Sequence, residues 1–76
     1  MISLTVHLYG KFKRPGTGGD MRMEAEAGTS VGELMDRLGL RGEVYRMVLV
    51  NGIRVGDGHR PADGDELHVF QPVGGG

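Results

Sequence analysis

The 76-residue sequence contains no cysteine and no tryptophan, and its aromatic residues are two tyrosines and two phenylalanines. The absence of cysteine excludes disulfides, thiolate metal ligands and a cysteine nucleophile. No apolar run approaches the ~20 residues that span a bilayer, and the start of the sequence lacks the basic and apolar segments of a signal peptide. The net charge is −1 with both signs interspersed, unlike the clustered basic surface that binds nucleic acid. We therefore expect a cytoplasmic protein that binds neither nucleic acid nor membrane.

Glycine, by contrast, makes up 15 of the 76 residues and separates segments that carry regular apolar patterns. Residues 2–9 and residues 21–27 alternate between apolar and polar side chains, which is typical of half-buried strands. The glycine-rich stretch 10–20 between them predicts a loop, so these two strands are expected to pair as a hairpin.

The second half of the chain predicts another hairpin and a last strand. Residues 45–50 are mainly apolar and lead into Asn51-Gly52, a dipeptide typical of a two-residue hairpin turn. Residues 53–55 form the expected return strand, and the turn-rich residues 56–66 lead to a short last strand at residues 67–70.

One helix is predicted between these two halves. Ser30 and Glu33 have the spacing of a capping box, which satisfies free backbone N–H groups at a helix start. Apolar residues follow at i, i+3, i+4 and i+7, and these are Val31, Leu34, Met35 and Leu38. Gly39 is the expected end of the helix. Because such a short helix is not stable alone in water, it must pack on the sheet.

The predicted order is therefore strand, strand, helix, strand, strand, strand. Because each apolar face must be covered by another, we expect an α+β fold in which the helix crosses a mixed four- to five-stranded sheet. The side chains expected to form the core are Ile2, Leu4, Val6, Leu8, Met21, Met23, Val31, Leu34, Met35, Leu38, Val48, Val50, Ile53, Val55, Leu67 and Val69.

The last stretch, Phe70–Gly76, differs from the body of the chain. Gln71 precedes a proline and is biased toward an extended backbone, and Pro72 cannot donate a hydrogen bond to continue a strand. The three glycines that follow lack side chains and fit a channel too narrow for other residues. The alternative for such a terminus is simple disorder. We predict a domain of residues 1–71 followed by a flexible glycine-rich tail, residues 72–76.

With these elements in place, the chain resembles the β-grasp sulfur-carrier family. It looks most like the small subunit of molybdopterin synthase, with the thiamine-pathway sulfur carrier as a relative and ubiquitin as a distant one. The stretches that carry the resemblance are Thr5–Tyr9, Ser30–Leu34, Val48–Gly52, Asp63–Leu67 and Phe70–Gly76. Gln71 stands where the synthase subunit usually has proline, and Gly74 where a small side chain is common. These departures bear on which biosynthetic pathway the protein serves more than on the chemistry of its C-terminus.

The resemblance implies a ubiquitin-like β-grasp fold and a carrier that is not itself an enzyme. In this family an E1-like adenylating enzyme uses ATP to activate the C-terminal carboxylate, and sulfur from a persulfide donor then displaces AMP to leave a thiocarboxylate. By this resemblance Gly75 and Gly76 form the reactive end, Gly74 gives clearance, and Pro72 and Val73 direct the tail. The implied role is sulfur donation in molybdenum or tungsten cofactor biosynthesis, with the large subunit of molybdopterin synthase as partner and no cofactor bound to the carrier.

Three alternatives stay open at this point. The same tail suits a ubiquitin-like modifier that is joined through Gly76 to protein lysines. It also suits a thiamine-pathway sulfur carrier that serves another sulfur-accepting enzyme. A plain interaction domain with passive glycines is the third. The sequence names neither the acceptor, nor the sulfur donor, nor the oligomeric state.

A partner-binding surface is predicted beside the tail. If Leu67 and Val69 point into the core, then His68 and Phe70 point outward, and the same parity turns Leu49 outward. In the β-grasp arrangement the last strand lies between the first and the third, which would join these side chains into one exposed patch. Exposed contiguous apolar surface usually marks a binding site. The predicted partner-binding residues are Leu49, His68, Phe70, Gln71, Pro72, Val73 and Gly74.

Two alternatives concern single residues of this surface. Phe70 could instead cover the edge of the core, because isolated exposed apolar residues are common. His7 and His68 are expected to be neighbours if the first and last strands pair. The sequence indicates no carboxylate or thiol companion for them, and a metal site needs three or four ligands, so no metal is predicted.

Overall fold

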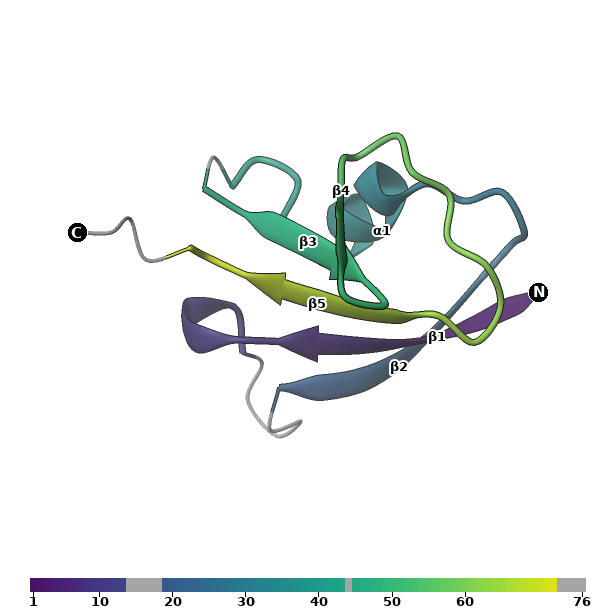
Figure 1. Ribbon diagram of the computed structural model, residues 1–76, viewed down its shortest axis with the longest axis horizontal. Coiled ribbons are helices and arrows are strands. Elements are labelled where there is room, and N and C mark those ends of the chain that lie inside the picture. Colours follow the sequence, from purple (N-terminus) through teal and green to yellow (C-terminus); the bar gives the residue numbers. More distant parts are fainter. Residues whose placement is uncertain (14–18, 44, 73–76) are drawn as a thin grey trace.

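A five-stranded sheet with a helix packed across one face makes up the fold (Figure 1). The computed structural model describes residues 1–13, 19–43 and 45–72. In chain order the elements are β1 (Ile2–Leu8), the 3-10 helix η1 (Gly10–Phe12), β2 (Asp20–Ala25), α1 (Val31–Arg37), β3 (Met47–Val50), β4 (Ile53–Val55) and β5 (Glu66–Phe70). The strands lie in the order β2-β1-β5-β3-β4. The central strand β5 runs parallel to β1 and antiparallel to β3, which gives the mixed α+β sheet that the sequence predicts.

The elements lie close to where the sequence places them. The second strand begins at Asp20 and ends at Ala25 instead of Ala27, and the third begins at Met47 instead of Tyr45. The predicted turn joins β3 and β4, and both of its central residues have positive φ, 51° at Asn51 and 85° at Gly52. Such angles are what a two-residue hairpin of this type requires.

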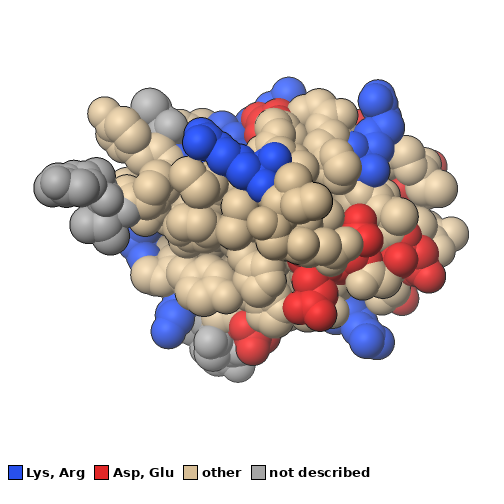
Figure 2. Space-filling model, in the orientation of Figure 1, with Lys and Arg blue, Asp and Glu red and all other residues tan. Residues whose placement is uncertain are grey.

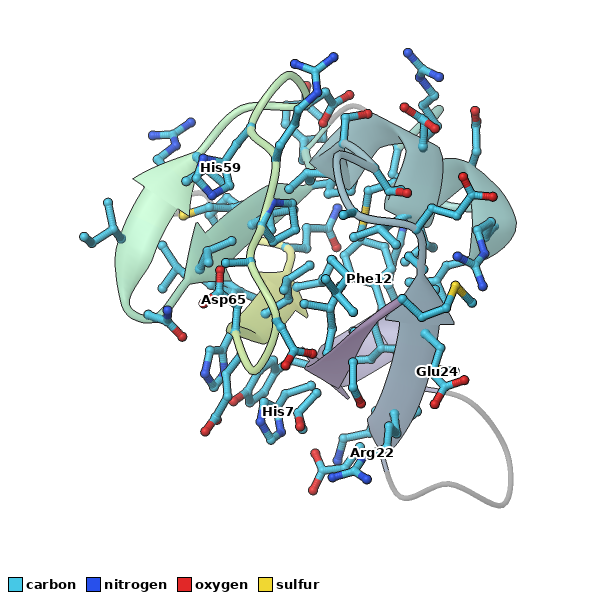
Figure 3. All side chains as sticks on the ribbon, turned by 90° about the vertical axis from the view of Figure 1, so that its right-hand side faces the viewer. His7, Phe12, Arg22, Glu24, His59 and Asp65 are labelled. Atoms are coloured by element: carbon cyan, nitrogen blue, oxygen red, sulfur yellow. The ribbon has the colours of Figure 1, made fainter. Side chains whose placement is uncertain are left out.

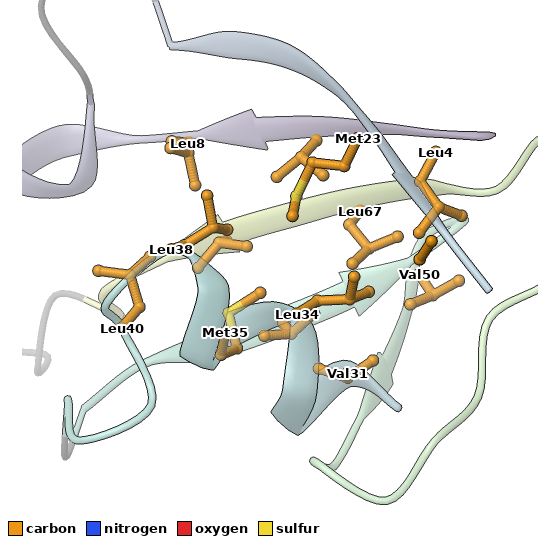
Figure 4. Close-up of a cluster of buried hydrophobic side chains, with 14 of the residues drawn as sticks. Leu4, Leu8, Met23, Val31, Leu34, Met35, Leu38, Leu40, Val50 and Leu67 are labelled. Carbon is orange, nitrogen blue, oxygen red and sulfur yellow. The ribbon is translucent and has the colours of Figure 1, made fainter. Parts of the chain in front are cut away.

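The core fills the space between α1 and the sheet, and Figure 4 shows leucine, valine and methionine side chains from the helix and the strands meeting there. Its buried members are Ile2, Leu4, Val6, Leu8, Phe12, Met23, Ala25, Val31, Leu34, Met35, Leu38, Leu40, Val48, Val50, Leu67 and Val69. Met21 and Val55 are only partly buried against it. The prediction for Ile53 is wrong, because this side chain is 69% exposed. Ile53 pairs with the buried Val50 and points to the same face, but it begins the three-residue edge strand β4, at the margin of the core.

The predicted loop at residues 10–20 contains a core residue that alternation could not reveal. Gly10–Phe12 forms the 3-10 turn η1, and Phe12 is 3% exposed. Its ring lies on the helix side of the sheet (Figure 3). Residues 14–18 of this loop lie outside the described part of the chain.

The helix start is held by the capping box and by the loop that precedes β5. The Ser30 hydroxyl accepts from the Glu33 backbone N–H at 3.2 Å, and the Glu33 carboxylate accepts from the Ser30 backbone N–H, as predicted. The N–H groups of Val31 and Gly32 donate to the carbonyls of His59 and Asp57, each at 2.8 Å. These bonds satisfy helix donors that have no partner within the helix.

The last strand ends at Phe70 and leads away from the sheet. Gln71 is exposed and Pro72 is half-buried, while residues 73–76 lie outside the described part of the chain. The boundary between domain and tail at residues 71 and 72 therefore stays a prediction. In the described residues no helix is both long and apolar enough to span a membrane.

Candidate functional site

On the face of the sheet opposite α1, which we call the outer face, one row of side chains crosses all five strands. His68 of β5 is paired with Leu49 of β3 on one side and with His7 of β1 on the other. The row extends to Arg54 of β4 and to Asp20 of β2. Because directly paired residues point to the same face of a sheet, the row is continuous. It carries apolar, imidazole and carboxylate groups side by side.

A shallow hollow of about 520 Å³ lies on the outer face. Its lining is mostly apolar and comes from Tyr9, Leu49, Gly52, His68 and Phe70; we call it the apolar hollow. Figure 2 shows an uncharged area left of the centre of this view, with basic side chains above and below it and acidic side chains gathered to its right. An apolar depression with a few polar groups and a charged margin is the common form of a binding surface.

Tyr9 connects the parts of this surface. Its ring meets the Phe70 ring edge-on, with centroids 6.2 Å apart, and its hydroxyl lies 2.9 Å from Nδ1 of His68. Tyr9 and Phe70 also line a second hollow of about 340 Å³, together with Gly10, Lys11 and Gln71. This second hollow lies where the chain leaves β5, so the outer face and the start of the tail form one continuous surface.

The histidine pair lies beside the apolar hollow. The rings of His7 and His68 are stacked, with centroids 4.5 Å apart and planes 15° apart. His7 Nδ1 lies 2.9 Å from a carboxylate oxygen of Asp20, and its Nε2 lies 3.1 Å from one of Glu66. The hydrogen bond to Asp20, and then that to Glu66, raises the pKa of His7 above 6.5 although partial burial opposes the charged form. Figure 3 shows His7 on the side of the sheet away from Phe12.

The structure brings together three of the residues predicted to bind a partner. Leu49, His68 and Phe70 are half-buried and line the apolar hollow, whereas the reactive and tail residues Val73, Gly74, Gly75 and Gly76 lie outside the described part of the chain. Phe70 lies on the outer face, so it does not cover the edge of the core. The partner-binding role of these residues stays a prediction.

Sequence reasoning missed two parts of this surface. In the alternating segment 2–9, Tyr9 falls on the same side as His7, and the pairing of the first and last strands places it beside the patch, but the predicted partner-binding residues do not include it. The expectation that no carboxylate accompanies the histidines is wrong, because Asp20 and Glu66 both contact His7. Both carboxylates reach His7 across strand pairs, and the register that brings them together is not visible in the sequence.

The comparison with known families settles what kind of protein has this geometry. The sequence profile of the ThiS family matches residues 6–76. The chain belongs to the ThiS family. It thus has a β-grasp, ubiquitin-like fold, and the resemblance to the β-grasp sulfur-carrier family stated from the sequence is confirmed. No curated protein matches this ThiS-family chain closely enough to count as a relative.

Solved structures share the fold over nearly their whole length. SAMP1 of Haloferax volcanii, a small archaeal modifier protein, is 26% identical, with 97% of this ThiS-family chain and 99% of that chain covered and a TM-score of 0.77. A putative molybdopterin converting factor subunit 1 from Pyrococcus furiosus is 24% identical over 96% of this chain and 100% of its own, with a TM-score of 0.79.

A third structure is a complex of two subunits. It contains subunits 1 and 2 of the molybdopterin-converting factor of Helicobacter pylori, and the matched chain is 21% identical with a TM-score of 0.69. The match covers 99% of this ThiS-family chain and 100% of that one. These three neighbours are a modifier and two molybdopterin converting factors. The same fold therefore occurs in proteins with different functions.

Proposed function

We propose that this protein carries sulfur as a thiocarboxylate on Gly76 and donates it in molybdopterin biosynthesis. The family match, which runs from the first strand through the terminal glycines, carries the thiocarboxylate part of the proposal, and the similarity to two molybdopterin converting factors supports the choice of pathway. The route of the chain supports it, because β5 leads directly from the apolar hollow to an exposed Gln71. A partner bound to the outer face would therefore have the tail within reach.

The chemistry belongs to a partner enzyme and to the terminal carboxylate. A free carboxylate is a poor acyl donor, so an E1-like partner first joins it to AMP with release of pyrophosphate from ATP. A persulfide sulfur on a donor then attacks the carbonyl carbon and AMP leaves. The attack forms a carbon–sulfur bond and keeps the persulfide's own sulfur–sulfur bond in an acyl disulfide. Attack by a second thiol of the donor then cleaves that sulfur–sulfur bond, which leaves the thiocarboxylate on Gly76 and a disulfide on the donor. In this scheme the carrier supplies an acceptor group and a docking surface, and it is not itself an enzyme.

The outer face supplies the docking surface in this proposal. Tyr9, Leu49 and Phe70 would be covered by an apolar segment of the partner, and His68 would lie at the centre of the contact. Aromatic anchors in the middle of an interface commonly contribute most of its binding energy. Gly74 and Gly75 would enter the partner's active site because they present no side chain.

Conjugation to protein lysines is the second candidate, and the similarity to SAMP1 favours it. Both uses begin with the same adenylate, so they differ only in the acceptor. A reconstitution that offers both acceptors distinguishes them. The carrier, produced together with an adenylating enzyme and a persulfide donor, would be incubated with the large subunit of molybdopterin synthase and its sulfur-free pterin precursor, and separately with cell protein.

Appearance of sulfur in the pterin product, with consumption of the thiocarboxylate, is the expected result. Lysine-linked adducts through Gly76, without sulfur in the pterin, would replace this proposal by the modifier function. A chain without Gly75 and Gly76 serves as the matched control, because it keeps β1 to β5 and α1 intact. It should stay folded and be inactive with both acceptors.

A further inference from the structure

The histidine pair on the outer face has a carboxylate within metal-ligand distance. One nitrogen from each ring of His7 and His68 and one carboxylate oxygen of Glu66 all lie within 4.8 Å of one another. The three residues come from adjacent strands, β1 and β5, and the register pairs the two histidines directly. A strand pair with a fixed register holds such side chains at a defined separation, as ligand sites require.

The separation of two of these ligand atoms fits a small cation with nitrogen and oxygen ligands. Zinc binds imidazole nitrogen at about 2.0–2.1 Å and carboxylate oxygen at about 2.0–2.2 Å, which places two ligands of a tetrahedral ion about 3.3 Å apart. His7 Nε2 and the Glu66 oxygen are 3.1 Å apart. The His68 ring is stacked on the His7 ring, with centroids 4.5 Å apart, so His68 has to rotate out of the stack to direct its nitrogen at the same ion.

In each of the two rings, Nδ1 already lies within hydrogen-bond distance of a polar group, as is common for metal-bound histidines. Asp20 holds Nδ1 of His7 at 2.9 Å, which leaves Nε2 directed toward Glu66. The Tyr9 hydroxyl lies 2.9 Å from Nδ1 of His68, which leaves Nε2 of that ring as its free nitrogen. Metal-ligating histidines almost always donate their second N–H to a carboxylate or another polar group, which fixes the ring and its tautomer. Here each histidine has such a partner.

We propose that His7, His68 and Glu66 form a zinc-class metal site on the outer face, with Asp20 and Tyr9 orienting the two imidazoles. Two imidazoles and one carboxylate suit first-row divalent ions such as Zn²⁺ and disfavour Mg²⁺ and Ca²⁺, which prefer oxygen ligands. Three protein ligands leave the fourth tetrahedral position to water. The side chain of Glu66 is 57% exposed, so the ion reaches the site directly from solvent.

The site borders the surface proposed for partner docking. His68 belongs both to the metal cluster and to the lining of the apolar hollow, so a bound ion would fix the orientation of that ring. The metal proposal does not rest on the sulfur-carrier function, because it concerns side chains of the folded domain and is measured by metal binding alone.

The test is a Zn²⁺ titration of the untagged full chain at neutral pH against a coloured zinc chelator, followed in parallel by NMR of the histidine imidazoles. We expect one equivalent of Zn²⁺ to bind with micromolar affinity and to shift the resonances of His7 and His68 while those of His59 stay unchanged. His59 is exposed in the loop before β5 and lies far from His7 in Figure 3, so it reports non-specific binding. Mg²⁺ in large excess should produce no shift.

Three variants and a matched control localise the site. Glu66→Gln and His68→Gln should each weaken Zn²⁺ binding at least tenfold, because each removes one of three ligands. Asp20→Asn should weaken it about tenfold, the lower end of the range for loss of a ligand's orienting partner. His59→Gln should leave affinity and stoichiometry unchanged. Circular dichroism of each variant would show that the fold is retained.

Either of two results would overturn the proposal. The first is the absence of stoichiometric Zn²⁺ binding by the parent chain, which would mean that Asp20 and Glu66 simply hydrogen-bond a protonated His7. The second is binding that His59→Gln weakens as much as His68→Gln does. Zn²⁺ binding is measured on the parent chain for the first result and on surface variants for the second. Neither result therefore depends on a variant that fails to fold.

Discussion

Phe12 and Phe70, the two phenylalanines of the chain, occupy opposite sides of the sheet. Phe12 is 3% exposed against the core, so Phe12→Ala should lower the free energy of unfolding by about 3–5 kcal/mol, the usual loss for a buried phenylalanine. Phe70 is half-buried on the outer face, so Phe70→Ala should lower it by about 1 kcal/mol. Phe70→Ala should nevertheless weaken binding to the adenylating partner by about 2 kcal/mol, roughly thirtyfold, because it removes a central aromatic anchor.

Urea unfolding and a binding titration measure the two effects separately. Tyr45→Ala is the matched control, since this aromatic residue is 70% exposed and lines neither hollow. It should change neither quantity. Unaltered partner affinity in Phe70→Ala would mean that the partner binds another surface.

At the scale of the elements, the start of α1 makes a direct prediction. Ser30→Ala removes the hydroxyl that accepts from the Glu33 N–H, and it should lower the free energy of unfolding by about 1 kcal/mol, which is typical for loss of an N-cap. Ser30→Asp keeps an acceptor oxygen at the cap and should retain most of the stability. Equal unfolding midpoints for Ser30→Ala and the parent chain would show that the loop carbonyls alone hold the helix start.

Local sequence signals were enough to predict most of the helices, strands and turns. The capping box, the Asn51-Gly52 turn and the alternation in β1 are local signals, and the structure contains all three features. Phe12 could not be assigned to the core because a single buried ring in a glycine-rich loop has no periodicity. Ile53 was misassigned because alternation does not tell which strand lies at the edge of a sheet.

At the scale of the whole molecule, ion pairs in the loops predict how stability responds to acid. The hydrogen bonds from Arg46 to Asp57, at 2.8 and 3.1 Å, lower the pKa of Asp57 below its usual 3.8 despite partial burial. A carboxyl whose pKa is lower in the folded state binds fewer protons there than in the unfolded state. Its contribution is therefore complete above the unfolded pKa of about 3.8 and is lost as the pH falls through the folded pKa.

Asp57→Asn tests this linkage by urea unfolding at a series of pH values. The variant should be less stable than the parent chain at neutral pH, and the difference should shrink as the pH falls below about 3.8. A stability difference that is the same at every pH would mean that the charge of Asp57 does not contribute.

The candidate site was less predictable than the fold because it depends on register. Strand parity was enough to turn Leu49, His68 and Phe70 to the outer face. The contacts of His7 with Asp20 and Glu66 arise only once β1 is paired with both β2 and β5 at a particular alignment. A local pattern cannot specify that alignment, since the partners are far apart in the sequence.

The central claim is that the terminal carboxylate of Gly76 is the group that this protein uses. Mass spectrometry of the C-terminal peptide, taken from chains produced with and without the adenylating enzyme and sulfur donor, tests it most directly. We predict that the peptide gains the mass difference between one sulfur and one oxygen atom, located at Gly76, only when both partners are present. A peptide that stays a plain carboxylate under those conditions, with the domain folded and both partners active, would contradict the account.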